Sequence, residues 1–128
     1  MMDLSYLKKY PFIYLCSAYT KQPNHDSACR EVCIAAAELM RAGVRVFSPI
    51  AHSHTVATLS GLDAADGAFW CDQDSPIQRA AGAIVILKML GWEKSDGIMS
   101  EIGQAGATAQ PIYGLDPVTL KLTKWGWG

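Results

Sequence analysis

The feature that most constrains the fold of this chain is a short apolar run at residues 83–87, soon followed by a segment with helical spacing at residues 95–109. The run Ala-Ile-Val-Ile-Leu is apolar throughout, which is typical of a strand buried on both faces of a parallel sheet. In the segment that follows, apolar side chains recur on one face, at Ile98, Ile102, Ala105 and Ala109. This spacing predicts a helix, capped by Ser95, whose apolar face packs on the sheet.

The same alternation of strand and helix runs through the rest of the chain. Residues 11–16 predict a first buried strand, and a helix with Asn24 or Asp26 as N-cap then runs to Arg41. Further strands are expected at 44–47 and 110–113, and residues 116–124 fit either a short helix or a strand. We therefore expect one domain over residues 1–128, an α/β three-layer sandwich around a mainly parallel sheet of four to five strands, Rossmann-like or flavodoxin-like.

Residues 50–67 form the least regular part of the sequence. A stretch of this length between a strand and a helix is often a functional loop or lid, and the alternative is a solvated loop that contains a short helix. A helix through Pro76 to Ala80 should follow, with Asp72 and Asp74 as candidate N-caps. The tryptophans of the tail, 125–128, are expected to cover an apolar patch or a partner subunit.

Composition excludes several classes of function. Half of the residues are apolar and the formal net charge is −1, so nothing favours binding to nucleic acid or to an anionic membrane. The apolar runs are far shorter than the ~20 residues of a membrane span, and the first residues lack a signal-peptide pattern. The cysteines form no CxxC pair and the histidines no metal-binding motif, so we expect buried, reduced thiols in a cytoplasmic protein without a metal; the four are Cys16, Cys29, Cys33 and Cys71. A glycine-rich phosphate loop is also missing from the sequence, and no cofactor is expected.

Polar residues follow the predicted strands at the edge where strands of a parallel sheet meet their helices, which is where ligands bind in such folds. Ser17 and Tyr19 follow the first strand, Ser48 and His54 the second, and Ser95, Asp96 and Glu101 the third. Glu101 should be half covered near the start of its helix. Its carboxylate is either a nucleophile, a base or an ordinary solvated side chain. His54 is either an acid–base group or a loop histidine.

This set of side chains suits chemistry at a glycosidic carbon, where one carboxylate attacks and another acid protonates the leaving group. Asp72 and Asp74 reach the site only if their helix begins on the same side of the sheet. A tyrosine hydroxyl such as that of Tyr19 can orient the nucleophile, whereas Tyr14 is expected in the core. The amides at the start of the Ser95 helix, with Ser17 nearby, can also hold a phosphate.

Two stretches resemble motifs of the nucleoside 2-deoxyribosyltransferase-like superfamily. Residues 13–19, Ile-Tyr-Leu-Cys-Ser-Ala-Tyr, resemble its first-strand motif, which usually reads Tyr-Leu-Ala-small-Pro-Tyr. Residues 95–105 resemble its Asp/Ser-x-Gly-x-x-x-Glu-Ile/Leu-Gly-x-Ala motif, whose glutamate is the nucleophile. Residues 47–50 and the Trp70-x-x-x-Asp74 spacing are similar to its DUF1937 branch. Ala18 replaces the usual proline, and Gly82 stands where members often have an aspartate.

The resemblance implies Glu101 as nucleophile, Asp74 as the aspartate that assists at the base, and Tyr19 in the pocket wall or orienting the glutamate. Asp72 takes the place of Asp74 if the alignment shifts by two residues. Further candidates for substrate binding are Ser17, Ser48, His54, Asp72, Ser95, Asp96 and Gly97.

The implied function is cleavage or transfer of the N-glycosidic bond of a nucleoside or nucleoside monophosphate by a homo-oligomer, a dimer or a tetramer. One alternative is a non-catalytic domain of the same fold that binds or senses a nucleoside or nucleotide. Another is an assembly module that depends on its tryptophan-rich tail.

Overall fold

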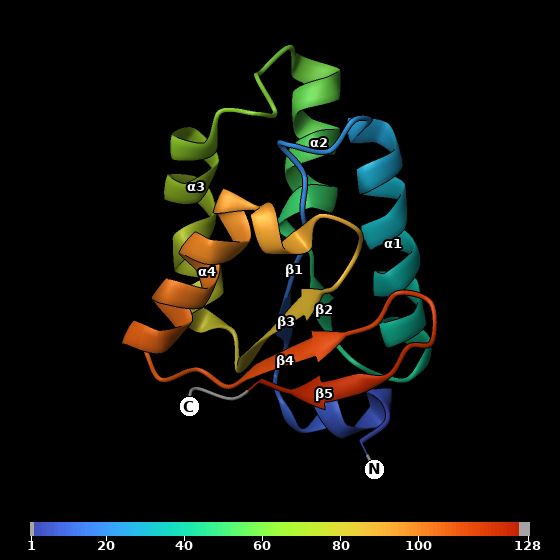
Figure 1. Cartoon of the computed structure of the whole chain (residues 1–128). Coiled ribbons are helices and arrows are strands. Elements are labelled where there is room, and N and C mark those ends of the chain that lie inside the picture. The colour runs from blue at the N-terminus through green and yellow to red at the C-terminus, as the bar shows by residue number, and fades with distance from the viewer. Residues whose placement is uncertain (1, 126–128) are drawn as a thin grey trace.

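The computed structural model of the chain describes residues 2–125 and contains a five-stranded sheet. The strand order is β2-β1-β3-β4-β5, in which the first four strands are parallel and β5 is antiparallel to β4 (Figure 1). The strands are β1 (Ile13–Cys16), β2 (Val46–Phe47), β3 (Ala83–Leu87), β4 (Ile112–Leu115) and β5 (Leu122–Lys124). The expectation of a mainly parallel sheet is confirmed, and residues 116–124 contribute its antiparallel edge strand.

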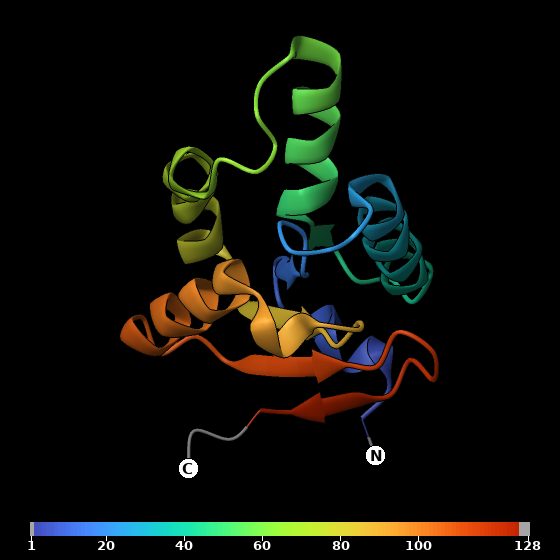
Figure 2. The same cartoon turned by 45° about the horizontal axis from the view of Figure 1, so that its top comes forward.

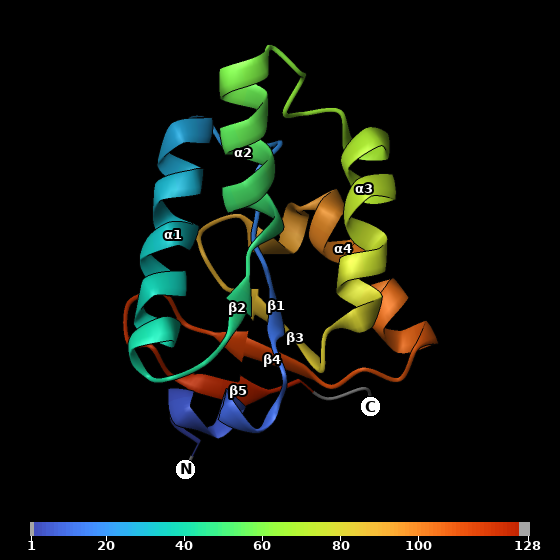
Figure 3. The ribbon, with the colours of Figure 1, turned by 180° about the vertical axis from the view of Figure 1, so that it is seen from behind.

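Helices cover both faces of this sheet, which gives the predicted three-layer sandwich. Four α-helices accompany two short 3-10 helices: α1 (His25–Arg41), α2 (Pro49–Ser60), α3 (Gly67–Ala80), α4 (Asp96–Ala107), η1 (Leu4–Lys9) and η2 (Trp92–Lys94). Figure 3 shows α1 on one side of the sheet and α3 and α4 together on the other. In Figure 2, α2 runs from the end of β2 away from the sheet. Within residues 2–125, none of the helices has both the length and the apolar character that crossing a membrane requires.

Side-chain caps fix where α1 and α4 begin. Asn24, one of the two candidates, caps α1, because its side chain accepts a hydrogen bond of 2.9 Å from the amide of Ser27. The Ser95 hydroxyl accepts one of 3.2 Å from the amide of Ile98 and caps α4, as predicted. Helix α4 ends at Ala107, so the expected end at Ala109 is wrong; this residue lies beyond the helix, exposed and with a φ of 57°.

The loop or lid expected at residues 50–67 is wrong for most of its length, because α2 occupies it. The alternative, a loop that contains a short helix, comes closer to the structure, although the helix fills most of the segment. The Ser48 hydroxyl accepts a hydrogen bond of 3.1 Å from the amide of Ala51, and Pro49 stands in the first turn, where its missing N–H costs nothing. Gly61 ends the helix in the left-handed region at φ 83°. These are ordinary start and stop signals, and only residues 61–66 remain as a loop.

Helix α3 also begins earlier than expected. The side chain of Asp66 accepts a hydrogen bond of 3.2 Å from the amide of Phe69 and caps this helix. Asp72 and Asp74 therefore lie within α3, and their prediction as N-caps is wrong. Because the two residues are two positions apart on a helix, their side chains point in different directions: Asp72 is exposed and Asp74 is buried.

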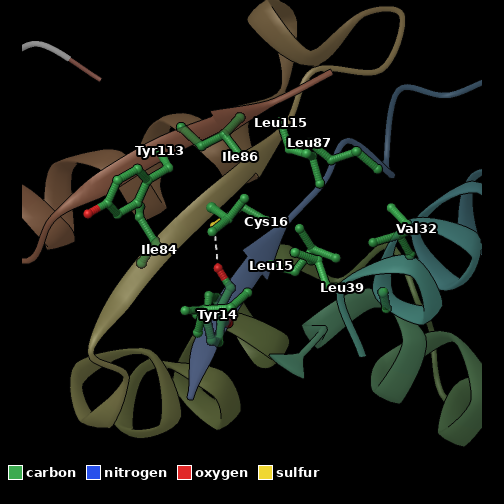
Figure 4. Close-up of a cluster of buried hydrophobic side chains, with 14 of the residues drawn as sticks. Tyr14, Leu15, Cys16, Val32, Leu39, Ile84, Ile86, Leu87, Tyr113 and Leu115 are labelled. Carbon is green, nitrogen blue, oxygen red and sulfur yellow. Dashed lines mark hydrogen bonds between the residues drawn. The ribbon is translucent and has the colours of Figure 1, made fainter. Parts of the chain in front are cut away.

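Side chains along the central strands point alternately to the two faces of the sheet, so the core has one half on each face. Leu15 in β1 points toward Val32 and Leu39 of α1, as Figure 4 shows. Tyr14 and Cys16 lie on the opposite face of the strand, where both interact with Glu101 of α4. Figure 4 also shows the contact of 3.9 Å between the Cys16 sulfur and the carbonyl oxygen of Tyr14. The face that carries Tyr14 and Cys16 is thus the one on which Glu101 of α4 packs.

Close packing explains the glycine that precedes β3. A Cβ atom on Gly82 would lie 2.8 Å from Cδ1 of Tyr10, closer than such atoms come. The Tyr10 hydroxyl in turn lies 2.6 Å from that of Tyr113 in β4. An aspartate at position 82 would displace this tyrosine pair.

The described part of the tail packs within the chain. The Trp125 ring lies 5.7 Å from that of Trp92, and the Lys88 ammonium lies over both rings, 5.7 Å from the centroid of Trp92 and 5.9 Å from that of Trp125. Trp125 thus covers an apolar patch, whereas Trp127 lies outside the described residues.

The four cysteines are free. Cys16 and Cys29 are buried, but Cys33 and Cys71, which we expected to be buried, are exposed.

Candidate active site

A cavity of about 460 Å³ opens at the edge of the sheet where the parallel strands end. We refer to it as the sheet-edge cavity. Its walls come from the β1–α1 junction, the first turns of α2, the loop before α3, and the facing sides of α3 and α4. Seven of the predicted site residues line it: Ser17, Tyr19, Asp74, Ser95, Asp96, Gly97 and Glu101. The topology therefore brings together residues from three separate strand–helix junctions.

Three other predicted site residues lie outside this lining. Ser48 is buried as the N-cap of α2, where its hydroxyl already accepts a backbone hydrogen bond. Asp72 is exposed on the outer side of α3. His54 lies behind the cavity wall, with its Nδ1 atom 2.6 Å from the hydroxyl of Tyr19.

Glu101 is half-buried in the second turn of α4. Burial raises the pKa of its carboxyl to about 8, and the nearby charge of Asp74 raises it as well. The thiol of Cys16 and the hydroxyl of Tyr14 act in the opposite direction, because they interact favourably with the ionised form. Glu101 therefore holds its proton at neutral pH.

Asp74 is the second carboxyl of the cavity. Only 7% of this residue is exposed, and its Oδ1 atom has no hydrogen-bond partner among the described residues. Burial raises the pKa of Asp74 to about 6, although the charge of His52 opposes the shift. A buried carboxylate oxygen without a partner is costly, so this atom is available to a ligand.

Near pH 7 the two carboxyls together carry about one proton and one negative charge, because their pKa values of about 6 and about 8 lie on either side of neutrality. Such a pair contains a general acid and a base or nucleophile in the same pocket. A bound substrate that hydrogen-bonds to one of the carboxyls can move the proton to the other.

Hydrogen bonds between α3 and α4 fix the relative position of the two carboxyls. The Gln78 side chain donates to the carbonyl oxygen of Glu101 over 2.8 Å. One turn away, Gln104 donates to the carbonyl oxygen of Ser75 over 3.2 Å, and the Ser75 hydroxyl donates to the Gln104 side chain over 3.2 Å. These cross-links give the site a rigid support, which precise placement of reacting groups requires.

A comparison with protein families matches residues 11–116 to the model described as "Domain of unknown function (DUF1937)". The chain belongs to the DUF1937 family. A search of curated proteins found no match. The region of the DUF1937 match includes every residue that lines the sheet-edge cavity, from Tyr14 to Gln104. The cavity therefore belongs to the part of the chain that defines the family.

In this DUF1937 domain Tyr14 lies in the core, as expected, and it also lines the cavity, which the sequence did not predict. Tyr14 is buried against Phe47, with ring centroids 5.8 Å apart. Burial, and then the charges of Glu101 and Asp74, raise the pKa of its phenol, so the hydroxyl keeps its proton and can donate. The period of two in β1 is the signal for this role, because it places Tyr14 on the same face as Cys16.

Two further features complete the wall of the cavity in the DUF1937 domain. Ser17 is 5% exposed, and its hydroxyl has no hydrogen-bond partner among residues 2–125. Trp70 donates from its indole nitrogen to the carbonyl oxygen of Asp63 over 2.9 Å, which ties the loop before α3 to the helix. Ala64 and Ala65 of this loop line the cavity.

In the described chain, no group of three or more histidine, cysteine, aspartate or glutamate residues could hold a metal ion.

Proposed function

We propose that this domain cleaves or transfers the N-glycosidic bond of a nucleoside or nucleoside monophosphate, with Glu101 as the nucleophile. The observation that carries the proposal is the pair of carboxyls: Glu101 and Asp74 line one cavity, and burial raises the pKa of both. The resemblance of residues 95–105 to the nucleophile motif of deoxyribosyltransferase-like enzymes supports the same roles.

In the proposed first step, the ionised oxygen of Glu101 attacks C1′ of the sugar. The bond from C1′ to the base nitrogen breaks, and its electron pair leaves with the base. In the reactive form Glu101 is ionised and Asp74 carries the proton. Asp74 gives this proton to a nitrogen of the departing base. The products are a free base and a glycosyl ester on Glu101, with Asp74 ionised.

In the second step, water or the nitrogen of another base attacks C1′ from the open side of the ester. The bond between C1′ and Glu101 breaks and returns an ionised carboxylate, while Asp74 takes the proton of the attacking group. Attack by water completes hydrolysis, and attack by a base completes transfer. Exclusion of water from the closed site decides between the two outcomes.

The remaining lining residues have roles that follow from their chemistry. Tyr14 can donate its hydroxyl proton to Glu101 and stabilise the ionised nucleophile. The unpartnered hydroxyl of Ser17 and the amides at the start of α4, near Ser95, Asp96 and Gly97, can hold the sugar or a 5′-phosphate. The ammonium of Lys21 lies 3.3 Å from Asp96 and balances the charge there.

The test is chromatographic detection of free base from a panel of nucleosides and their 5′-monophosphates, each with and without an acceptor base. We expect Glu101→Gln to abolish base release, while the matched control Glu93→Gln, an exposed residue outside the cavity, retains it. Asp74→Asn should lower the rate far more than Asp72→Asn, which changes an exposed residue of the same helix.

Base release that persists in Glu101→Gln would contradict the proposal. Thermal stabilisation by a panel member without base release, in both the parent protein and Glu101→Gln, would instead identify a binding or sensor domain. The resemblance also leads us to propose a cytoplasmic homo-oligomer, a dimer or a tetramer, and light scattering on the purified protein measures that state.

A further inference from the structure

A hydrogen-bonded chain of three side chains lies behind one wall of the sheet-edge cavity. The hydroxyl of Tyr19 lies 2.6 Å from Nδ1 of His54, and Nε2 of His54 lies 2.8 Å from Oδ1 of Asp26. Tyr19 belongs to the β1–α1 junction, His54 to α2, and Asp26 to the first turn of α1. The chain therefore connects the cavity wall to the outer surface, because the Asp26 side chain is 87% exposed.

The chemistry of the three groups sets the direction of the hydrogen bonds. An ionised carboxylate only accepts hydrogen bonds, so Nε2 of His54 must carry a proton toward Asp26. When the imidazole is neutral, its other nitrogen then has no proton and acts as an acceptor. The Tyr19 hydroxyl must donate to Nδ1, which commits the single proton of this hydroxyl and leaves its oxygen as an acceptor.

Packing holds the tyrosine in place. Its ring stacks on that of His25, with centroids 4.3 Å apart and planes 24° apart, and its ring is edge-on to His54. Only 4% of Tyr19 is exposed, although it lines the cavity. Burial also raises the pKa of the phenol, which keeps the proton on the hydroxyl. The orientation of this hydroxyl is therefore fixed before a ligand enters.

We propose that Asp26 and His54 are positioning residues that present the Tyr19 hydroxyl to the cavity as a hydrogen-bond acceptor, so that this wall selects a ligand with a donor group such as a sugar hydroxyl. The inference rests on the proposed function for the identity of the ligand, and it names one determinant of specificity. If the hydrogen bonds between Tyr19, His54 and Asp26 had only a structural role, they would hold α1 against α2 and have no effect on selectivity.

The direction of the chain is tested first, by long-range proton–nitrogen correlation NMR of the histidine rings in the full-length protein at a pH where imidazole is neutral. We expect the Nε2–H tautomer for His54. In Asp26→Asn, the side-chain amide can accept from Nε2–H or donate to Nε2, so the preference for the Nε2–H tautomer should weaken and part of His54 should change to the Nδ1–H tautomer, which donates to Tyr19. Asp72→Asn, at another exposed position, should leave the tautomer unchanged. An Nδ1–H tautomer in the parent protein overturns the inference.

Selectivity is tested next, with the nucleoside that releases base fastest and its analogues in which each sugar hydroxyl in turn is methylated. Methylation keeps the acceptor oxygen and removes the donor. One analogue should lose roughly tenfold in kcat/KM with the parent protein, mainly through KM. Asp26→Asn and His54→Gln should reduce that discrimination while the rate on the unmodified nucleoside retains its dependence on Glu101. Equal discrimination in the parent and in both variants overturns the inference.

The two failures are distinguishable. Absence of base release from every nucleoside overturns the proposed function, and in that case the tautomer of His54 and its response to Asp26→Asn decide the inference alone.

Discussion

The half-buried side chain of Glu101 should make this protein less stable as the pH rises, and replacing it with glutamine should remove that loss. The group ionises near its ordinary value of 4.5 in the unfolded chain and near a pKa of about 8 in the folded one. Between these values the unfolded state has lost the proton and the folded state retains it. The free energy of unfolding therefore falls with increasing pH over this window.

The size of the effect follows from the difference between the two pKa values. The two pKa values differ by about 3.5, and a difference of one in pKa corresponds to about 1.4 kcal/mol, so the total loss of stability is roughly 5 kcal/mol. Most of this loss, roughly 4 kcal/mol, falls between about pH 5 and pH 9. A domain of this kind has a total stability of about 5–15 kcal/mol, so the change is readily measured. Glutamine has nearly the same shape and no charge at any pH.

The assay is urea denaturation of the parent protein and of Glu101→Gln at a series of pH values, with the free energy extrapolated to water. The two proteins should have similar stability near pH 5, and the variant should be the more stable by roughly 4 kcal/mol near pH 9. The exposed Glu93→Gln serves as control and should follow the parent protein. A stability difference between parent and Glu101→Gln that does not change with pH would refute the reasoning, since the carboxyl would then titrate alike in both states.

Other outcomes follow from the same structure. The rate of base release should have a bell-shaped pH dependence with limbs near the pKa values of about 6 and about 8. Asp74→Asn should remove one limb and shift the other to lower pH, because the charge of Asp74 no longer raises the pKa of Glu101. Steady-state rates across pH test both outcomes. Gln78→Ala should lower both stability, by about 1–3 kcal/mol, and kcat, because the carbonyl of Glu101 loses its donor; an unchanged kcat would mean that this bond does not place the nucleophile. Gly82→Ala should destabilise the fold by crowding Tyr10, whereas Gly103→Ala, in an open position of α4, should stabilise it by about 0.5–1 kcal/mol, and thermal melts compare the two.

The sequence predicted best those elements whose signals are local. The uninterrupted apolar run of 83–87 gave β3 its correct bounds, and the serine at position 95 gave the start of α4. Helix α2 was expected only as a short helix within a loop, although Ser48, Pro49 and Gly61 mark its ends. Its apolar residues lack a single face, because it extends away from the sheet (Figure 2) and only part of it is covered. Local signals for its ends carried more information than its periodicity.

The arrangement of the site depended on longer-range features. The sheet topology was enough to bring Ser17, Glu101 and Gly97 to one edge. The choice between Asp72 and Asp74 depended on where α3 begins and how it rotates against α4, which the hydrogen bond from Gln78 to the backbone of Glu101 sets. The link from Tyr19 through His54 to Asp26 joins the β1–α1 region to α2, and no spacing in the sequence predicts it, because His54 lies 35 residues from Tyr19.

The exposed thiols give this protein two natural attachment points for a chemical label. Cys71 lies in the cavity wall, and Cys33 lies on α1, outside it. A ligand that fills the cavity should slow alkylation at Cys71 and leave Cys33 as an internal reference, with the two sites separated by peptide mass spectrometry. The unmodified chain can therefore report occupancy of its own pocket, for ligands that are turned over and for those that are only bound.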